Sequence, residues 1–228
     1  MEKYDLVVIG AGPSGYAAAM RALDFKRRTL LIEKNQVGGA GVTNGALSSK
    51  TWWELSREIA SFRRNLNKFN IQAPEVSYKE IQREVRNAVR ERKSMLEDHM
   101  HQMQDSRHAH LLTFLEGSAY LLSANEVQIT TAAGTKVVWA DYIILATGSR
   151  PRYLPELPID EKVVMTSDGI ENMDDFPESM VVVGAGVIGC EFATIFSGFG
   201  KTKVNLIDKG DRILPFEDED VVKVIERN

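Results

Sequence analysis

The sequence predicts an α/β protein with two Rossmann-like units, the second incomplete, and a helical and β-meander insertion in the first. Two observations support this prediction. Asp5–Lys34 is echoed by Ser179–Lys209, and both segments read as strand, glycine turn, helix and strand. Between these repeats lie a long polar helical region and several short β-rich runs, which supply the insertion.

Each repeat begins with a continuous aliphatic run, Leu6–Ile9 in the first and Val181–Val183 in the second. Such runs are typical of parallel strands that are buried on both faces. The following strand ends in an acid, Glu33 or Asp208, about 20 residues beyond the turn. A carboxylate in that position can accept hydrogen bonds from a ribose 2′-hydroxyl.

Both turns carry the pattern G-x-G-x-x-G. The first glycine permits a tight turn, the second lets backbone amides reach a pyrophosphate, and the third lets the helix pack on the sheet. One copy alone also occurs in sheets that bind no nucleotide. The duplication, with both acids in place, predicts two dinucleotide-binding domains. The glycines are Gly10, Gly12 and Gly15 in the first repeat and Gly184, Gly186 and Gly189 in the second.

The insertion begins with a polar helical stretch, Ile59–Gln104, in which apolar residues recur every three or four positions. Its arginines and lysines are interleaved with glutamates, so a solvated helix face is favoured over a nucleic-acid patch. Three short runs, Leu111–Leu115, Glu126–Thr131 and Thr135–Trp139, then predict a small meander, with Ala133-Gly134 as a turn.

The composition argues against several classes of partner. Twenty-eight basic and 32 acidic residues give a net charge of -4, which provides no field to attract nucleic acid or anionic lipid. The apolar run Met180–Gly189 is short and is followed by Glu191, so no transmembrane segment is expected. The N-terminus has no signal-peptide layout, which predicts a cytoplasmic protein.

Thiol and metal chemistry are also disfavoured. Cys190 is the only cysteine, which excludes chemistry based on an internal cysteine pair. His101, His108 and His110 have no acidic or thiol cluster at ligand spacing, so they are read as exposed polar residues and no metal site is predicted.

Two unlike dinucleotide motifs flanking the loop Val37–Lys50 resemble the pyridine nucleotide-disulfide oxidoreductase family, which includes dihydrolipoamide dehydrogenase, glutathione reductase and soluble transhydrogenase. The redox loop of the dihydrolipoamide dehydrogenases reads GGTCLNVGCIPSK, and this chain reads GGAGVTNGALSSK from Gly38 to Lys50. Gly41 and Ala46 stand at the two cysteine positions, and Ser48 replaces the proline. The loop therefore has neither cysteine of the family loop, but it keeps the other residues of the pattern at Gly38, Gly39, Gly45, Ser49 and Lys50.

The resemblance implies that residues 1–148 bind FAD and that residues 149–228 form the N-terminal part of an NAD(P)-binding domain. Two further segments of this chain resemble family elements. Ala146-Thr147-Gly148, after the strand Tyr142–Leu145, matches an A-T-G element at the domain crossover, and Glu116–Ala119 matches the segment that passes the FAD adenine. The FAD residues would be Gly10, Gly12, Pro13, Ser14, Gly15, Glu33, Lys34, Gly38, Gly39, Lys50, Gly117, Ser118, Ala119, Ala146, Thr147 and Gly148. The nicotinamide dinucleotide would contact Gly184, Gly186, Val187, Ile188, Gly189 and Asp208.

The resemblance further implies that Lys50 and Glu191 are the catalytic pair, with the Lys50 ammonium beside the isoalloxazine near flavin N5. The alternative is that both are solvated helix residues. Trp52 and Trp53 follow Lys50, and core packing is favoured for them over stacking on the flavin.

Without a disulfide, the resemblance implies an FAD-dependent NAD(P)H oxidoreductase that passes hydride to FAD and on to a small-molecule acceptor: a quinone, oxygen or a second nicotinamide. The alternative is a non-catalytic FAD/NAD-binding fragment or pseudoenzyme module. Asp208 favours NAD(H), because a carboxylate repels a 2′-phosphate, whereas Lys209 and Arg212 keep NADP(H) possible.

The second repeat stops soon after Asp208, with a helix expected at Glu219–Arg227, so its sheet lacks later strands. We therefore expect the N-terminal portion of a longer flavoprotein. The resemblance implies a homodimer in the full-length form.

Overall fold

The computed structural model describes residues 1–72, 75–105 and 109–227. It divides the chain into two compact units. Unit 1 comprises Met1–Leu47 and Ala88–Arg152, and unit 2 comprises Ser48–Asn87 and Tyr153–Asn228. The predicted assignment of one cofactor to residues 1–148 and another to residues 149–228 stays a prediction.

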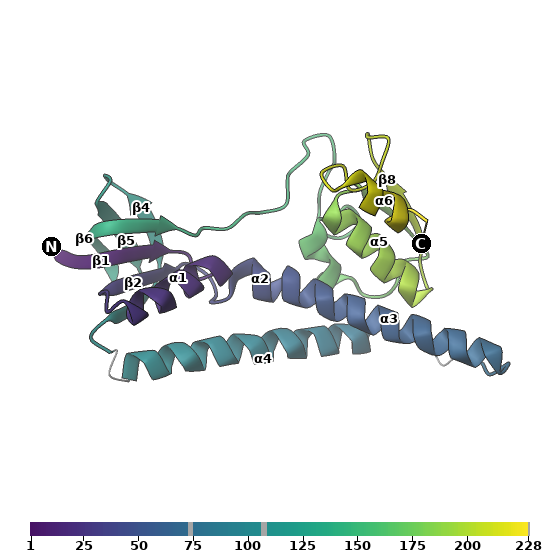
Figure 1. The fold of residues 1–228 in the computed structure, drawn as a ribbon, viewed down its shortest axis with the longest axis horizontal. Helices are drawn as coiled ribbons and strands as arrows, with labels where there is room; N and C mark the ends of the chain where they lie inside the picture. Colours follow the sequence, from purple (N-terminus) through teal and green to yellow (C-terminus); the bar gives the residue numbers. More distant parts are fainter. Residues whose placement is uncertain (73–74, 106–108, 228) are drawn as a thin grey trace. The chain divides into compact units, whose positions relative to one another are not determined.

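Both repeats fold as βαβ units, β1–α1–β2 and β7–α5–β8, as the sequence predicts. Figure 1 traces the chain through its elements, which are β1 (Glu2–Ile9), α1 (Pro13–Asp24), β2 (Thr29–Glu33), α2 (Gly39–Thr43), α3 (Ala46–Lys68), α4 (Tyr78–Asp105), β3 (Leu112–Glu116), β4 (Ser118–Leu121), β5 (Glu126–Thr131), β6 (Gly134–Leu145), the 3-10 helix η1 (Ser167–Asn172), β7 (Ser179–Val183), α5 (Val187–Phe199), β8 (Lys203–Ile207) and α6 (Glu219–Ile225).

The sheet of unit 1 has the strand order β3-β2-β1-β6-β5-β4. Its first four strands pair in parallel, and β4, β5 and β6 pair antiparallel. The meander is therefore an extension of the central sheet, because β6 continues through both Thr135–Trp139 and Tyr142–Leu145 as one strand. The segment expected as the first strand of the meander, Leu111–Leu115, instead forms β3 and pairs in parallel with β2.

Two apolar clusters stabilise unit 1, one on each face of the sheet. On one face, side chains of β1 and β2 pack with α1 and with Met100 of α4. On the other, Tyr4, Val7 and Leu30 pack with side chains of β5 and β6, such as Ile129. Because the central sheet is covered on both faces, the successive residues Val7 and Val8 of β1 are both buried, as the run Leu6–Ile9 predicts.

In unit 2, β7 and β8 pair in parallel and α5 connects them. Alternate residues of β7 differ in exposure: Val181 and Val183 are each 58% exposed, whereas Met180 packs on the apolar cluster. The burial expected on both faces of Val181–Val183 is therefore wrong for this strand, because α5 covers one face only.

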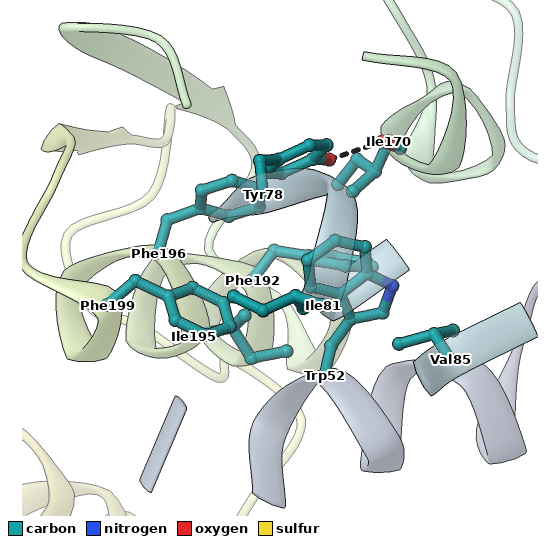
Figure 2. Close-up of a cluster of buried hydrophobic side chains, with 9 residues drawn as sticks. All are labelled: Trp52, Tyr78, Ile81, Val85, Ile170, Phe192, Ile195, Phe196 and Phe199. Carbon is teal, nitrogen blue, oxygen red and sulfur yellow. Dashed lines mark hydrogen bonds between the residues drawn. The ribbon is translucent and has the colours of Figure 1, made fainter. Parts of the chain in front are cut away.

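The core of unit 2 is aromatic and centres on Trp52 (Figure 2). Trp52 is 1% exposed, and its ring lies 6.4 Å from that of Phe196 and 6.0 Å from that of Phe199. The expectation that Trp52 packs in a core is confirmed. The same expectation is wrong for Trp53, which is 36% exposed, carries Arg57 over its ring at 5.0 Å and lies outside this core.

The helical region predicted as one stretch, Ile59–Gln104, is two helices, α3 and α4. Asn70, just after α3, has a φ of 53°. Asparagine tolerates this left-handed conformation better than most residues. A residue in this conformation commonly follows the end of a helix.

Candidate functional site

The first glycine turn joins β1 to α1 in unit 1. Gly10 has a φ of 104°, and a Cβ there would lie 2.2 Å from the carbonyl oxygen of Ala146. The Ala146 amide in turn donates to the carbonyl of Ile9 at 2.8 Å. The A-T-G element therefore packs directly on the first glycine, which explains why no side chain fits there.

The other two glycines of this turn have different surroundings. A Cβ on Gly15 would lie 1.9 Å from the carbonyl oxygen of Gly10, so the helix can approach the strand only without a side chain. A Cβ on Gly12 would meet nothing within 4 Å. Gly12 is the N-cap of α1, with Pro13 beginning the helix. The backbone amides in the first turn of α1 therefore lie beside open space. Unpaired amides at the start of a helix can bind a phosphate group.

Glu33 is tied to the same turn. Its carboxylate accepts hydrogen bonds from the amide of Ala11 at 2.7 Å and from that of Asn35 at 2.9 Å. The backbone carbonyl of Glu33 accepts from the amide of Gly117 at 2.8 Å. The structure therefore brings three sequence-predicted elements together at one end of β2: the glycine turn, the acid, and the segment Gly117–Ala119.

Within unit 1, residues 38–41 of the loop that lacks both family cysteines pack on the first glycine turn. The Gly38 amide donates to the carbonyl of Ala11 at 2.8 Å, and a Cβ on Gly39 would lie 3.1 Å from the Cα of Gly12. A Cβ on Gly41, at the first cysteine position of the family loop, would lie 2.4 Å from the Cγ of Pro13. Position 41 therefore has no room for a cysteine unless the backbone moves.

The second turn, in unit 2, repeats the geometry of the first. Gly184 has a φ of 106°, and a Cβ on Gly189 would lie 1.8 Å from the carbonyl oxygen of Gly184. Gly186 is the N-cap of α5, and a Cβ there would meet nothing within 4 Å. Val187 and Ile188, in the first turn of α5, are exposed.

Asp208 has the role in the second repeat that Glu33 has in the first. It accepts hydrogen bonds from the amides of Ala185 and Gly210, both at 2.7 Å. These two amides hold the pKa of Asp208 below its ordinary value. Each acid thus orders its own turn before any ligand is present, and each carboxylate oxygen keeps acceptor capacity for a ribose hydroxyl.

Lys50 and Glu191 meet within unit 2. Lys50 Nζ lies 2.5 Å from Glu191 Oε1, and the side chains are 62% and 17% exposed. Lys50 comes from the first turns of α3 and Glu191 from the first turns of α5. The two side chains therefore form an ion pair, and the choice between a catalytic pair beside a flavin and two solvated helix residues stays a prediction.

Ala11 and Ala185 were not expected among the functional positions. They supply the amides that fix the two acids, and they occupy the same place in both repeats, between the first and second glycines. The sequence Gly-Ala-Gly, which occurs in both turns, was the signal that could have indicated these two alanines. Amide donors cannot be recognised from the residue type, since every residue except proline has one.

No group of three or more His, Cys, Asp and Glu side chains in the described ranges is placed to hold a metal ion. His101 and His110 lie within those ranges, whereas His108 lies outside the described residues. Among the described helices, none is long and apolar enough to cross a membrane.

Comparison with known proteins decides the family. The model of the pyridine nucleotide-disulphide oxidoreductases matches residues 4–228, nearly the whole chain. The chain belongs to this family. Members of this oxidoreductase family use FAD together with NAD(P)H.

Two curated relatives illustrate the similarity. A dihydrolipoyl dehydrogenase of Bacillus subtilis is 31% identical over 225 residues, which cover 97% of this chain and 47% of the relative. A soluble pyridine nucleotide transhydrogenase of Hahella chejuensis is 35% identical over 222 residues, which cover 96% of this chain and 46% of the relative. This chain therefore spans about half the length of such oxidoreductases.

The crystal structure of LpdA from Mycobacterium tuberculosis is similar to this oxidoreductase chain with a TM-score of 0.83 and 25% identity. The alignment covers 100% of this chain and 49% of that protein. The α/β architecture predicted from the two repeats, with Rossmann-type domains, is thus confirmed.

Proposed function

We propose that this chain supplies the FAD-binding part and the first half of the nicotinamide-binding part of an oxidoreductase that passes electrons from NAD(P)H to a non-thiol acceptor. The observation that carries this proposal is the matched pair of glycine turns. In each turn the second glycine borders open space, and an acid is fixed on the turn by a backbone amide.

In unit 1, the amides at the start of α1 would hold the FAD pyrophosphate, and Glu33 would accept hydrogen bonds from its ribose. The absence of any atom within 4 Å of a Cβ at Gly12 supports this assignment, because the phosphate needs that approach. The remaining residues of the proposed FAD set are Gly10, Pro13, Ser14, Gly15, Lys34, Gly38, Gly39, Gly117, Ser118, Ala119, Ala146, Thr147 and Gly148.

Lys50 and Glu191 would act at the reacting end of the cofactors. FAD, when bound, supplies the chemistry of accepting a hydride and passing electrons on. The Lys50 ammonium would stabilise negative charge placed near it, and the 2.5 Å contact with Glu191 holds the ammonium at one position. Glu191 would orient Lys50 or the nicotinamide.

The electron acceptor is proposed to be a quinone, oxygen or a second nicotinamide. The chain has one cysteine, and Gly41 and Ala46 occupy the positions of the family's redox pair. A dithiol acceptor would need a thiol partner that this chain does not provide.

NAD(H) is proposed as the preferred nicotinamide cofactor. The Asp208 carboxylate would face the ribose and repel a 2′-phosphate. Arg212 is one of the two basic residues for which the sequence analysis kept NADP(H) as an alternative cofactor. Its guanidinium donates to the backbone carbonyls of Pro215 at 2.8 Å and Glu217 at 3.3 Å. Its guanidinium therefore stabilises the loop that follows β8, which supports the choice of NAD(H).

An anaerobic titration tests the proposal. A form of the protein that contains the complete nicotinamide site is loaded with FAD, NADH is added, and the flavin absorbance in the visible range is followed before quinone, oxygen or a second nicotinamide is supplied. Loss of absorbance with NADH and its return with one acceptor are expected. Flavin that binds but is not reduced by NADH or NADPH would favour the alternative, a non-catalytic FAD/NAD-binding module. A homodimer of the full-length protein and a cytoplasmic location stay predictions.

A further inference from the structure

Tyr16 of α1 and His99 of α4 meet in unit 1, although they are 83 positions apart in the sequence. Tyr16 Oη lies 2.5 Å from His99 Nδ1, and the centres of the two rings are 6.0 Å apart. The carbonyl oxygen of Leu96, at 3.5 Å from Tyr16 Oη, is a weaker partner. Whichever ring nitrogen of His99 carries the proton, the two side chains share one hydrogen bond, because a hydroxyl can donate to Nδ1 or accept from it. Burial raises the pKa of the Tyr16 hydroxyl, so this group stays neutral at neutral pH.

Tyr16 completes the first turn of α1. Its backbone amide donates to the carbonyl of the N-cap residue, Gly12, at 2.8 Å. Pro13 has no amide hydrogen, so the first turn offers a ligand the amides of Ser14 and Gly15, which precede Tyr16 directly. A side-chain contact at Tyr16 therefore acts within one turn of the amides that are proposed to hold the FAD pyrophosphate.

The neighbours of His99 on its face of α4 are apolar. Leu96 and Met103 lie three and four positions from His99 and therefore share this face. Both pack, together with Met100, in the apolar cluster that also contains residues of α1. Apolar packing is non-directional, whereas a hydrogen bond requires a defined length and angle. The contact between Tyr16 and His99 therefore fixes the placement of α1 on α4 more narrowly than the apolar cluster alone.

We propose that His99, acting through Tyr16, is a positioning residue that holds the start of α1 where its amides bind the FAD pyrophosphate. The hydrogen bond is a property of unit 1 without cofactor, and its consequence for FAD rests on the proposed function. Neither side chain has to touch FAD, because the backbone of the first turn of α1 transmits the effect. Loss of the bond should weaken FAD binding by about two- to tenfold, the fold-change that the net contribution of one hydrogen bond predicts.

Titration of the present chain with FAD, followed by flavin fluorescence, tests the inference. Tyr16→Phe removes only the hydroxyl group, and His99→Leu removes the ring nitrogens, so each variant should bind FAD about two- to tenfold more weakly than the wild type. The double variant should bind no more weakly than either single one, because both substitutions remove the same hydrogen bond. The dissociation constant refers to folded protein, so a variant that is less stable but still folded keeps the wild-type value.

A spectroscopic signature locates the effect within the cofactor. At saturating FAD, the phosphorus NMR signals report on the pyrophosphate, and the visible spectrum reports on the isoalloxazine ring. The phosphorus signals should shift in Tyr16→Phe and in His99→Leu, whereas the visible spectrum should stay as in the wild type. A shift confined to the pyrophosphate is the result expected if the start of α1 has moved.

Two further variants separate positioning from a general loss of structure. His99→Asn keeps a nitrogen or oxygen near the position of Nδ1 and should bind FAD as the wild type does. His101→Leu removes an exposed histidine of α4 and should change neither the affinity nor the phosphorus signals. Far-UV circular dichroism reports on folding. If His99→Leu disturbs that signal, the smaller change Tyr16→Phe decides.

Wild-type affinity and phosphorus signals in folded Tyr16→Phe and His99→Leu would overturn the inference alone and leave the proposed FAD site standing. Additive losses in the double variant, or an equal loss in His101→Leu, would also overturn the inference. A wild-type protein that binds no FAD would refute the proposed FAD site itself, and the inference with it.

Discussion

Lys50 Nζ lies 2.5 Å from Glu191 Oε1, although the two residues are 141 positions apart in the sequence. In a protein that contains the complete cofactor site, Lys50→Met should retain FAD but slow its reduction by NADH by about 100-fold, because a positive charge that stabilises developing negative charge is lost. Stopped-flow absorbance measures this rate. Lys79→Met removes another exposed lysine of unit 2 and should change nothing. Equal rates in the two variants would contradict the catalytic assignment of Lys50.

The second glycine of the first turn gives a test of FAD binding that spares the fold. Gly12→Val should fold normally, since a Cβ there meets nothing within 4 Å, but should lose FAD because the side chain occupies the approach of the pyrophosphate. Flavin content after purification and circular dichroism measure both effects.

Gly15→Val is the matched contrast. Its Cβ would lie 1.9 Å from the carbonyl oxygen of Gly10, so this variant should lose stability as well as FAD. Wild-type flavin occupancy in folded Gly12→Val would place the pyrophosphate elsewhere.

Local patterns allowed the two βαβ repeats to be predicted from sequence. An aliphatic run such as Leu30–Ile32 and a glycine turn are determined by residues within about 30 positions of each other, which is the size of a βαβ unit. The pairing of Lys50 with Glu191 became predictable only through the family resemblance, because an ion pair between distant charges leaves no local trace.

Contacts that depend on tertiary packing were not predictable. The continuity of β6 through Ala140 and Asp141 follows from its pairing with β5 on one side and β1 on the other. The exposure of Val181 depends on which neighbours cover β7, and an aliphatic run alone does not report this.

Electron transfer should not depend on Cys190. Its Sγ lies 3.4 Å from the carbonyl of Ala185, and burial raises the pKa of the thiol, so little reactive thiolate forms at neutral pH. Cys190→Ser keeps a donor to that carbonyl, and in a protein that contains the complete cofactor site its flavin should be reduced by NADH at the wild-type rate in stopped-flow experiments. This substitution is preferable to alkylation, which would add bulk beside the second glycine turn. A large rate loss in folded Cys190→Ser would show that the thiol takes part.

The amide hydrogen bonds to Asp208 predict a pH-dependent contribution to stability. Because these bonds lower the pKa of Asp208 from its ordinary 3.8, the stabilisation is present above pH 3.8 and is lost as the pH falls through the folded-state pKa. Asp208→Asn should therefore melt below the wild type at pH 7, and the gap should narrow as the pH drops below 3.8. Thermal melts followed by circular dichroism measure this gap. A gap that stays constant with pH would contradict the role of the charge.

Asp208 also provides the sharpest test of nicotinamide choice in a protein that contains the complete cofactor site. Asp208→Ser removes the carboxylate that would repel a 2′-phosphate, and serine can still accept a hydrogen bond from Ala185. The ratio of kcat/KM for NADH to that for NADPH should fall by about tenfold, because one charge–charge repulsion against the 2′-phosphate is removed. Glu217→Ser serves as the control, since this residue contributes only its backbone carbonyl to the loop after β8. If both variants keep the wild-type ratio, Asp208 does not face the ribose and its hydrogen bonds to Ala185 and Gly210 are its whole role.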